Sequence, residues 1–562
     1  MRFHHFPLLT LLAISLSAAE TPILDVMSAE AERSMEGLKS QDPPPYFLSY
    51  EITESRRIFV SASFGALTGS VDSRRRQLDT DLRVGDYSFD SSHPVRGRGG
   101  RGFGGGGGGF SYVEVPVEND PAAIKNVLWR STDSAYKRAV EQLTRVQSND
   151  QVAIEAEDQS ADFSRENPRE ASEEIVEIKL DRAAWEEKVR RYSAPFSAYG
   201  NIFNASVTLS VTGETRWYVN SEGARVRTSQ PYYRLAISAD TKADDGMRLP
   251  RYESFFSSDP GGLPDDAKVL ETVQGMIDDL AGLRQAPVVE PYTGPAILSG
   301  RAAGVFFHEV LGHRLEGHRL KSEDEGQTFK GKVDEAVLPE AFSVVFDPTL
   351  PMIGGVDLAG AYTFDNQGVP SRRLPVIEDG LFKNFLMSRT PIEGFATSNG
   401  HGRKQAGFRP VARQSNLLVE SSETLSYSEL EKRLMELLEE QDKPFGLIFE
   451  DIQGGFTLTG RRMANAFNVL PILVYRLHRD GRRELVRGVD LIGTPLTALS
   501  KVVAAGDKVE VFNGTCGAES GGVPVSAASP PILISQIEVQ KKAKSQDRPP
   551  LLPAPFEEKL LP

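Results

Sequence analysis

The stretch AAGVFFHEVLGHRLEGH, from Ala302 to His318, decides how this chain folds and what it can bind. Its first six residues are apolar or small, which indicates a buried helix. The next eleven carry three of the chain's eight histidines, interleaved with two glutamates. Polar groups directly after a buried run are costly unless something pairs with them. The pattern therefore predicts a metal site at the end of a buried helix.

The spacing of the first two histidines is unusual for such a site. His308 and His313 are five residues apart, which separates them by about 140° around a regular helix. Their rings could not easily meet one ion in that geometry. A single wide π-type turn would bring them toward one face, and Gly312 could deform with little steric cost. Such a turn is one way in which the motif could build a metal site.

A regular helix offers a second set of ligands. Glu309, His313 and Glu316 are four and three residues apart, so they would share one helix face and could hold a metal. The two interpretations differ in the role of Glu309, which is a metal ligand in the set on a regular helix face. In the other it is the free general base, as in zinc proteases that carry a glutamate directly after the first histidine. Both stay open at this point, as does a contribution from Glu316.

The third ligand has to come from elsewhere in the chain. A catalytic zinc usually has three protein ligands and an open position for water. Cys516 is the only cysteine, and it lies in the glycine-rich stretch NGTCGAESGGVPV, which we expect to be a loop. A coordinated thiolate is a strong ligand, so Cys516 is the first candidate. The alternatives are His318, His401 and His478.

Composition limits the compartment and the partners. Residues 1–19 have a weakly positive start, an apolar core and small residues at the end, which predicts a signal peptide and export to the periplasm or the medium. This run is too short to span a bilayer as an anchor, and no second apolar stretch approaches the length of a transmembrane helix. The net charge of −14 argues against nucleic-acid binding, although the Gly-rich insert at 95–110 resembles an arginine-glycine box.

Periodicity divides the remaining chain into two parts and a tail. Residues 20–288 form an N-terminal mixed α+β domain, residues 289–540 a largely antiparallel β domain that carries the motif helix, and residues 541–562 a Pro-rich tail. The overall fold class is therefore α+β. The predicted local features are strands on either side of a charged turn at 54–57, a hairpin turn at Asn220–Gly223, and helices at 122–146, 181–194, 265–283, 425–441 and 495–505.

Several segments together resemble the TldD/TldE (PmbA) metalloproteases. They are YTGPAIL (292–298) leading into HEVLGHRLEG (308–317), FDNQGVPSRRLPVIEDGLFKNFL (364–386), NGHGRKQAGFRPVARQSN (399–416) and NGTCGAESGGVPVSAASPPILISQIEV (513–539). The resemblance implies a two-domain subunit whose β-rich C-terminal domain holds zinc through His308, His313 and Cys516, with Glu309 as the catalytic glutamate. It also implies a dimer, either a homodimer or a heterodimer with a TldE/PmbA-like subunit, that admits extended or unfolded peptides. This chain resembles the catalytic TldD-like subunit.

The sequence thus predicts a zinc metallopeptidase in which Glu309 activates water for peptide hydrolysis. Arg413 and Asn416 are candidate contacts for the substrate backbone or the developing oxyanion, and a loop-stabilising role is equally compatible with them. Two other functions remain open. The protein could bind peptides as a metal-dependent chaperone without cutting them. Alternatively, the zinc could be structural, with His318 filling the fourth position.

Overall fold

The computed structural model describes residues 22–94, 113–150, 158–322, 325, 327–460, 466–542, 550 and 552. The predicted signal peptide at 1–19, the Gly-rich insert at 95–110 and most of the Pro-rich tail at 541–562 lie outside these residues. Among the helices that are described, none is long and apolar enough to cross a membrane.

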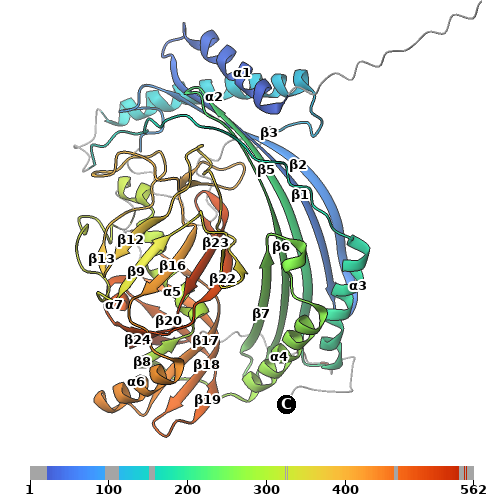
Figure 1. Ribbon diagram of the computed structural model, residues 1–562, viewed down its shortest axis with the longest axis vertical. Coiled ribbons are helices and arrows are strands. Elements are labelled where there is room, and N and C mark those ends of the chain that lie inside the picture. Colours follow the sequence, from blue (N-terminus) through green and yellow to red (C-terminus); the bar gives the residue numbers. More distant parts are fainter. Residues whose placement is uncertain are drawn as a thin grey trace, which may run out of the picture.

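The first part of the chain builds a curved sheet of very long strands, called the N-terminal sheet here (Figure 1). Its order is β3-β2-β1-β5-β6-β4, and β7 also pairs with β6. The concave side of the sheet turns toward the C-terminal half (Figure 1). Its strands are β1 (Pro45–Ser63), β2 (Ala66–Val84), β3 (Val113–Glu114), β4 (Glu170–Ser172), β5 (Asn204–Asn220), β6 (Arg225–Lys242) and β7 (Arg248–Ser257).

The predicted charged turn at 54–57 is wrong, because β1 runs through it without a break. The charged side chains of this stretch pair with the neighbouring strand: Arg56 contacts Asp72 at 2.8 Å and Glu54 contacts Arg74 at 2.8 Å. The chain reverses later, at Phe64 and Gly65, which both have positive φ. The predicted turn at Asn220–Gly223 is confirmed, and it joins β5 to β6.

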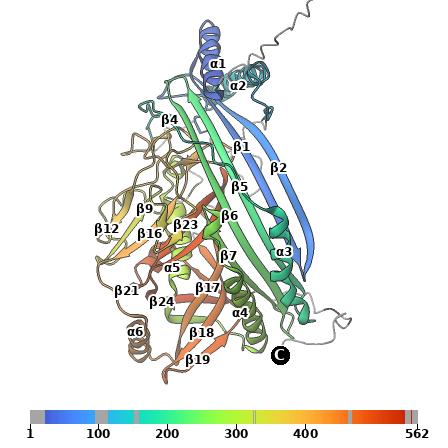
Figure 2. The same cartoon turned by 45° about the vertical axis from the view of Figure 1, so that its right-hand side comes forward.

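Four helices pack around this sheet, and the three predicted for this region are confirmed. They are α1 (Ile23–Leu38), α2 (Pro121–Asp150), α3 (Arg182–Ser193) and α4 (Asp266–Gln285), with short 3-10 turns η1 (Ala194–Ala198) and η2 (Pro260–Gly262). The Asp181 carboxylate accepts a hydrogen bond from the amide of Ala184, so Asp181 caps α3 as its position suggested. Helix α3 lies across the face that turns away from the C-terminal half (Figure 2).

The C-terminal half contains two larger sheets. The first has the order β13-β12-β9-β16-β23-β22, and the second has the order β17-β8-β24-β20-β18-β19, with β21 paired to β24. Most pairings are antiparallel, but β16–β23 and β17–β8 are parallel. The chain as a whole is α+β, as predicted. The strands are β8 (Tyr292–Leu298), β9 (Phe342–Phe346), β12 (Leu374–Glu378), β13 (Leu381–Phe382), β16 (Asn416–Ser421), β17 (Phe445–Thr457), β18 (Phe467–His478), β19 (Arg483–Val486), β20 (Val489–Gly493), β21 (Val502–Ala505), β22 (Glu510–Ala518), β23 (Gly521–Ser529) and β24 (Ile532–Lys541), with the short pairs β10 (Met352–Ile353) with β11 (Val356–Asp357) and β14 (Gly402–Arg403) with β15 (Val411–Ala412).

The two predicted helices of this half have different outcomes. Helix α6 (Tyr427–Glu440) is confirmed, and Ser426 and Glu429 form a capping box at its start. The helix predicted at 495–505 is only partly right. Helix α7 (Pro495–Leu499) is short, and the β-branched run that follows it becomes β21, which pairs with β24. Strand pairing outweighs the weak helical pattern there.

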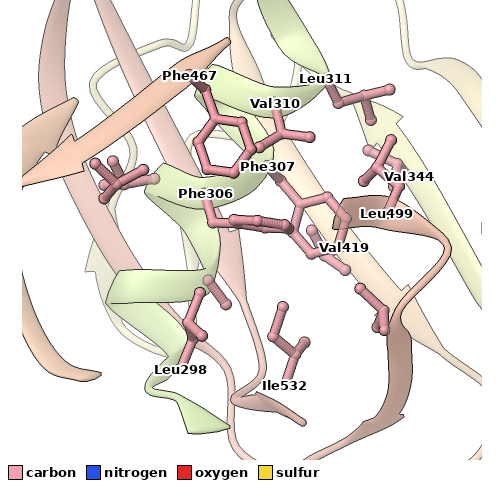
Figure 3. Close-up of a cluster of buried hydrophobic side chains, with 14 of the residues drawn as sticks. Leu298, Phe306, Phe307, Val310, Leu311, Val344, Val419, Phe467, Leu499 and Ile532 are labelled. Carbon is pink, nitrogen blue, oxygen red and sulfur yellow. The ribbon is translucent and has the colours of Figure 1, made fainter. Parts of the chain in front are cut away.

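The motif helix α5 (Gly300–Val310) lies inside this half, and all its residues except Arg301 are buried. The Ser299 hydroxyl caps it by accepting a hydrogen bond from the amide of Ala302 at 3.2 Å. Phe306 and Phe307 are fully buried, and they pack with Val310, Leu311 and Phe467 (Figure 3). Each such side chain contributes about 1.5–3 kcal/mol by leaving water. The helix end that carries His308 is therefore fixed by the core.

Helix α5 and strand β23 approach each other closely at Gly304, where a larger residue would clash. A Cβ atom at Gly304 would lie 2.9 Å from the carbonyl oxygen of Ala527, whereas a Cβ atom at Gly275 in α4 would meet nothing within 4 Å. We expect Gly304→Ala to lower the free energy of unfolding by about 1–3 kcal/mol through overpacking. The matched variant Gly275→Ala should raise it by up to about 1 kcal/mol. Guanidinium unfolding followed by far-UV circular dichroism measures both. Stabilisation by Gly304→Ala would show that α5 is not held against β23.

Candidate metal centre

The motif brings its two histidines together by ending the helix. Helix α5 stops at Val310, Leu311 leaves the regular α conformation with φ −109° and ψ −56°, and a 3-10 helix, η3 (Gly312–Leu315), follows. The ring centroids of His308 and His313 are 5.1 Å apart and the rings are nearly perpendicular. The π-type turn, one of the two alternatives left open by the spacing, is therefore not formed. A tighter 3-10 turn after the end of the helix brings the two imidazole rings together instead.

The alternative set on a regular helix face is not formed. The α-helix ends before His313, so Glu309, His313 and Glu316 do not share one face. Glu316 instead lies on the far side of the His313 ring, with its Oε2 3.3 Å from Nδ1. This contact orients the imidazole and leaves the other ring nitrogen, Nε2, directed at Cys516.

Cys516, which lies 203 positions after His313 in the sequence, completes the cluster. Its Sγ lies 3.3 Å from His313 Nε2. The donor atoms of His308, His313 and Cys516 all lie within 4.8 Å of one another. The three side chains are only 8%, 7% and 4% exposed. The sequence suggested a loop around Cys516, but this residue lies in strand β22, opposite Val523 of β23. The turn comes after it.

The cluster is strongly charged although it is buried. Burial by itself would raise the pKa of the Cys516 thiol, but the neighbouring His313, His308 and Arg413 lower it well below its usual range. Burial likewise opposes the charged form of His313, and the Cys516 and Glu316 charges outweigh it and raise the pKa. Cys516 is therefore held as a thiolate, which is the form that binds metals.

Glu309 follows His308 on the helix and points into the same space. It is buried, and its Oε2 has no hydrogen-bond partner in the described part of the chain. Burial is the main reason that its pKa is raised. Gly455 of β17 makes room for it, because a Cβ atom there would lie 2.7 Å from Glu309 Cγ. A buried, unpartnered carboxylate next to metal ligands is suited to exchange a proton with water or substrate.

A layer of buried charges surrounds the donors. Glu316 is fully buried and accepts hydrogen bonds from Arg319 Nη2 at 2.6 Å and Nε at 2.9 Å. Burial opposes its ionisation, but the charges of His313 and Arg319 outweigh burial and lower the pKa of Glu316 to about 2. Carboxylates that accept a hydrogen bond from a ligating histidine fix the ring and its tautomer.

The two candidate substrate contacts have structural partners instead. Arg413 is fully buried and donates to the carbonyl oxygen of Cys516 at 2.7 Å. Asn416 is also fully buried, and its Nδ2 donates to the carbonyls of Asp347 and Leu350. Most of the hydrogen bonds of these two side chains go to main-chain atoms of other segments, which favours the loop-stabilising role over contact with a peptide.

Gln414, between these two candidates, is the residue that sequence reasoning missed. Its Nε2 lies 3.3 Å from the carbonyl oxygen and 3.4 Å from Nε2 of His308. A Cβ atom at Gly312 would lie 1.9 Å from Gln414 Oε1, so any other residue there would displace the Gln414 amide from its present position. The only sequence signal for Gln414 is weak, namely its position within the stretch ARQSN.

The other candidate histidines lie apart from the cluster. His318 pairs with Glu519, His401 contacts the Asn399 amide oxygen at 3.0 Å, and His478 contacts Glu484 at 3.1 Å. Within the described residues, the only group of three or more candidate ligands consists of His308, His313 and Cys516. Two imidazoles and a thiolate fit a zinc-type ion, and three ligands leave a position for water.

Comparisons with known proteins agree with this architecture. Residues 291–541 match the PmbA/TldA metallopeptidase C-terminal domain, and residues 166–273 match the PmbA/TldA metallopeptidase central domain. A metalloprotease of Archaeoglobus fulgidus is 32% identical over 244 residues, which are 42% of this chain and 51% of that protein. A zinc metalloprotease TldD homologue of Saccharolobus solfataricus is 22% identical over 253 residues, 44% of this chain and 51% of that protein.

The chain thus spans about half the length of the curated relatives it matches. A solved structure of TldE from Thermococcus kodakarensis has the same fold, with a TM-score of 0.58 and 14% identity over 92% of this chain and 100% of that one. The two matched domains include the motif helix, both larger C-terminal sheets and the strand that carries Cys516. The chain belongs to the PmbA/TldD metallopeptidase family.

Proposed function

We propose that this chain is a zinc-dependent peptidase whose ligands are His308, His313 and Cys516. The observation that carries the proposal is the convergence of three buried donors beside Glu309, a carboxylate with an unpartnered oxygen. A structural site would have four filled positions, and here the described residues supply three. The zinc-metalloprotease name of one relative supports zinc as the ion.

Zinc bound by these three side chains would supply a Lewis acid that polarises the scissile carbonyl and acidifies water. The protein's own residues do the remaining work. Glu309 Oε2 takes a proton from the attacking water and returns it to the leaving nitrogen. Its raised pKa favours the first of these transfers, because a carboxylate whose conjugate acid has a raised pKa is a stronger base. His313 is kept in one orientation by Glu316 throughout.

The substrate, the partner and the compartment follow from the family resemblance and the N-terminal sequence. We infer that extended or unfolded peptides are cut, because the reacting groups are buried and a folded protein could not reach them. The chain carries the metal motif and so corresponds to the catalytic subunit, paired with a second copy or with a TldE/PmbA-like subunit. The apolar N-terminus at 1–19 supports export to the periplasm or the medium.

The role of Glu309 is tested with an unstructured polypeptide as substrate and zinc-loaded protein. Glu309→Gln should keep zinc and the fold but lower the cleavage rate by about 10²–10⁴-fold, because proton transfer is lost. Asp490→Asn is the matched control, since Asp490 is another buried carboxylate with an unpartnered oxygen, and it should cleave normally. Wild-type cleavage by zinc-loaded Glu309→Gln would exclude Glu309 as the base. Zinc-bound wild type that binds peptides without cutting them would favour the chaperone function.

The ligand set is tested by metal analysis of purified variants. His313→Gln and Cys516→Ser should each reduce bound zinc from one ion per chain to a small fraction, whereas His478→Gln should keep it, because His478 pairs with Glu484 outside the cluster. Chelation of the wild type should abolish cleavage and leave the far-UV circular dichroism spectrum unchanged, and added zinc should restore activity. Unfolding on chelation would instead indicate a structural metal.

A further inference from the structure

Two of the proposed ligands come from distant parts of the chain and must be held in register. His313 and Cys516 are 203 positions apart, and they lie in η3 and in β22. Strand β22 forms its backbone hydrogen bonds with β23, and its strand pairing does not include η3. The packing of α5 against β22 and β23 brings the two segments together, and side chains between them can set the final distance between the imidazole and the thiolate.

Arg413 contacts the segment that carries the cysteine. Its Nη2 donates to the carbonyl oxygen of Cys516 at 2.7 Å. Its Nη1 donates to Ser520 Oγ at 2.7 Å and to the Gly521 carbonyl oxygen at 3.0 Å. These three acceptors span the turn from β22 to β23. The two terminal nitrogens of the guanidinium therefore bind the hairpin that carries Cys516.

The same guanidinium faces the histidine side of the site. Arg413 Nε lies 3.3 Å from Glu316 Oε1. The other oxygen of Glu316, Oε2, lies 3.3 Å from His313 Nδ1. A guanidinium is planar and rigid, so it can fix the separation of groups on its two edges, which a flexible ammonium could not. A continuous path thus joins the His313 ring, Glu316, Arg413 and the Cys516 main chain.

The burial of this pair is expensive. Arg413 and Glu316 are both fully buried. An apolar pair of the same volume would often be at least as stable. The desolvation of these two charges is explained if the pair holds the metal ligands at a fixed distance. We propose that Arg413 and Glu316 are positioning residues that set the distance between the His313 imidazole and the Cys516 thiolate. This inference rests on the proposed metal site.

Arg389 provides a matched control for the effect of removing a buried arginine. It is fully buried, pairs with Glu222 at 2.7 Å, and donates to the Ser164 carbonyl oxygen. Neither of these partners contacts His308, His313 or Cys516. Loss of Arg389 therefore removes a buried arginine from an ion pair with a partly buried carboxylate, and it leaves the path between the ligands unchanged.

The experiment uses cobalt(II) in place of zinc, because its absorption reports directly on the ligands. Wild type loaded with cobalt should show a near-ultraviolet thiolate-to-cobalt charge-transfer band. Arg413→Met should bind cobalt about 10–100-fold more weakly and show a weaker band per bound ion, as expected when support for a ligand is lost. Arg389→Met should keep the wild-type affinity and band, even if it lowers the unfolding temperature.

The double variant Arg413→Met/Glu316→Gln protects the test against a folding failure, because it removes the carboxylate charge that Arg413→Met leaves behind. It should fold and still show the weaker band. A wild-type band and affinity in either Arg413 variant would overturn the positioning role, as would an equal loss in Arg389→Met. A wild-type protein that binds cobalt without any thiolate band would overturn Cys516 as a ligand, and with it both proposals.

Discussion

The burial of four ionisable side chains at the end of an apolar helix is the constraint on which the site depends. His308, Glu309, His313 and Cys516 are all buried, each with less than a tenth of its surface exposed. Buried charges are tolerated only when they are paired or bind a metal. The surrounding arginines and Glu316 supply pairs for the His313 and Cys516 side of the cluster. A metal ion would supply the rest.

The packing of α5 makes this constraint possible. The helix is enclosed by strands of both larger C-terminal sheets, and its glycines let backbone approach backbone at β23. Gly312 and Gly455 play the same part next to the ligands, since a methyl group at either position would strike Gln414 or Glu309. Reactive groups held this closely keep their geometry without rearrangement, which favours catalysis over adaptable binding.

Two glutamates of one motif have opposite environments, and this difference assigns their roles. Glu309 is buried beside the proposed ligands, and burial outweighs the neighbouring histidines and raises its pKa, so it can exchange protons. Glu316 has arginines and a histidine around it, its pKa falls to about 2, and it stays ionised. The first suits a base and the second suits a fixed support. Their seven-residue separation in sequence says nothing of this contrast, because burial and charged neighbours come from other segments.

The sequence by itself determined the α+β class, the helices with clear caps such as Asp181 and Ser426, and the cluster of polar groups after a buried helix. These are local properties, set by periodicity and by the hydrogen bonds that a helix end requires. The tertiary structure alone decided the course of β1 through its charges, the 3-10 turn at Gly312, the strand conformation of Cys516, and the roles of Gln414 and Arg413. Each depends on which distant segment lies opposite, and local patterns report burial but not the identity of the neighbour.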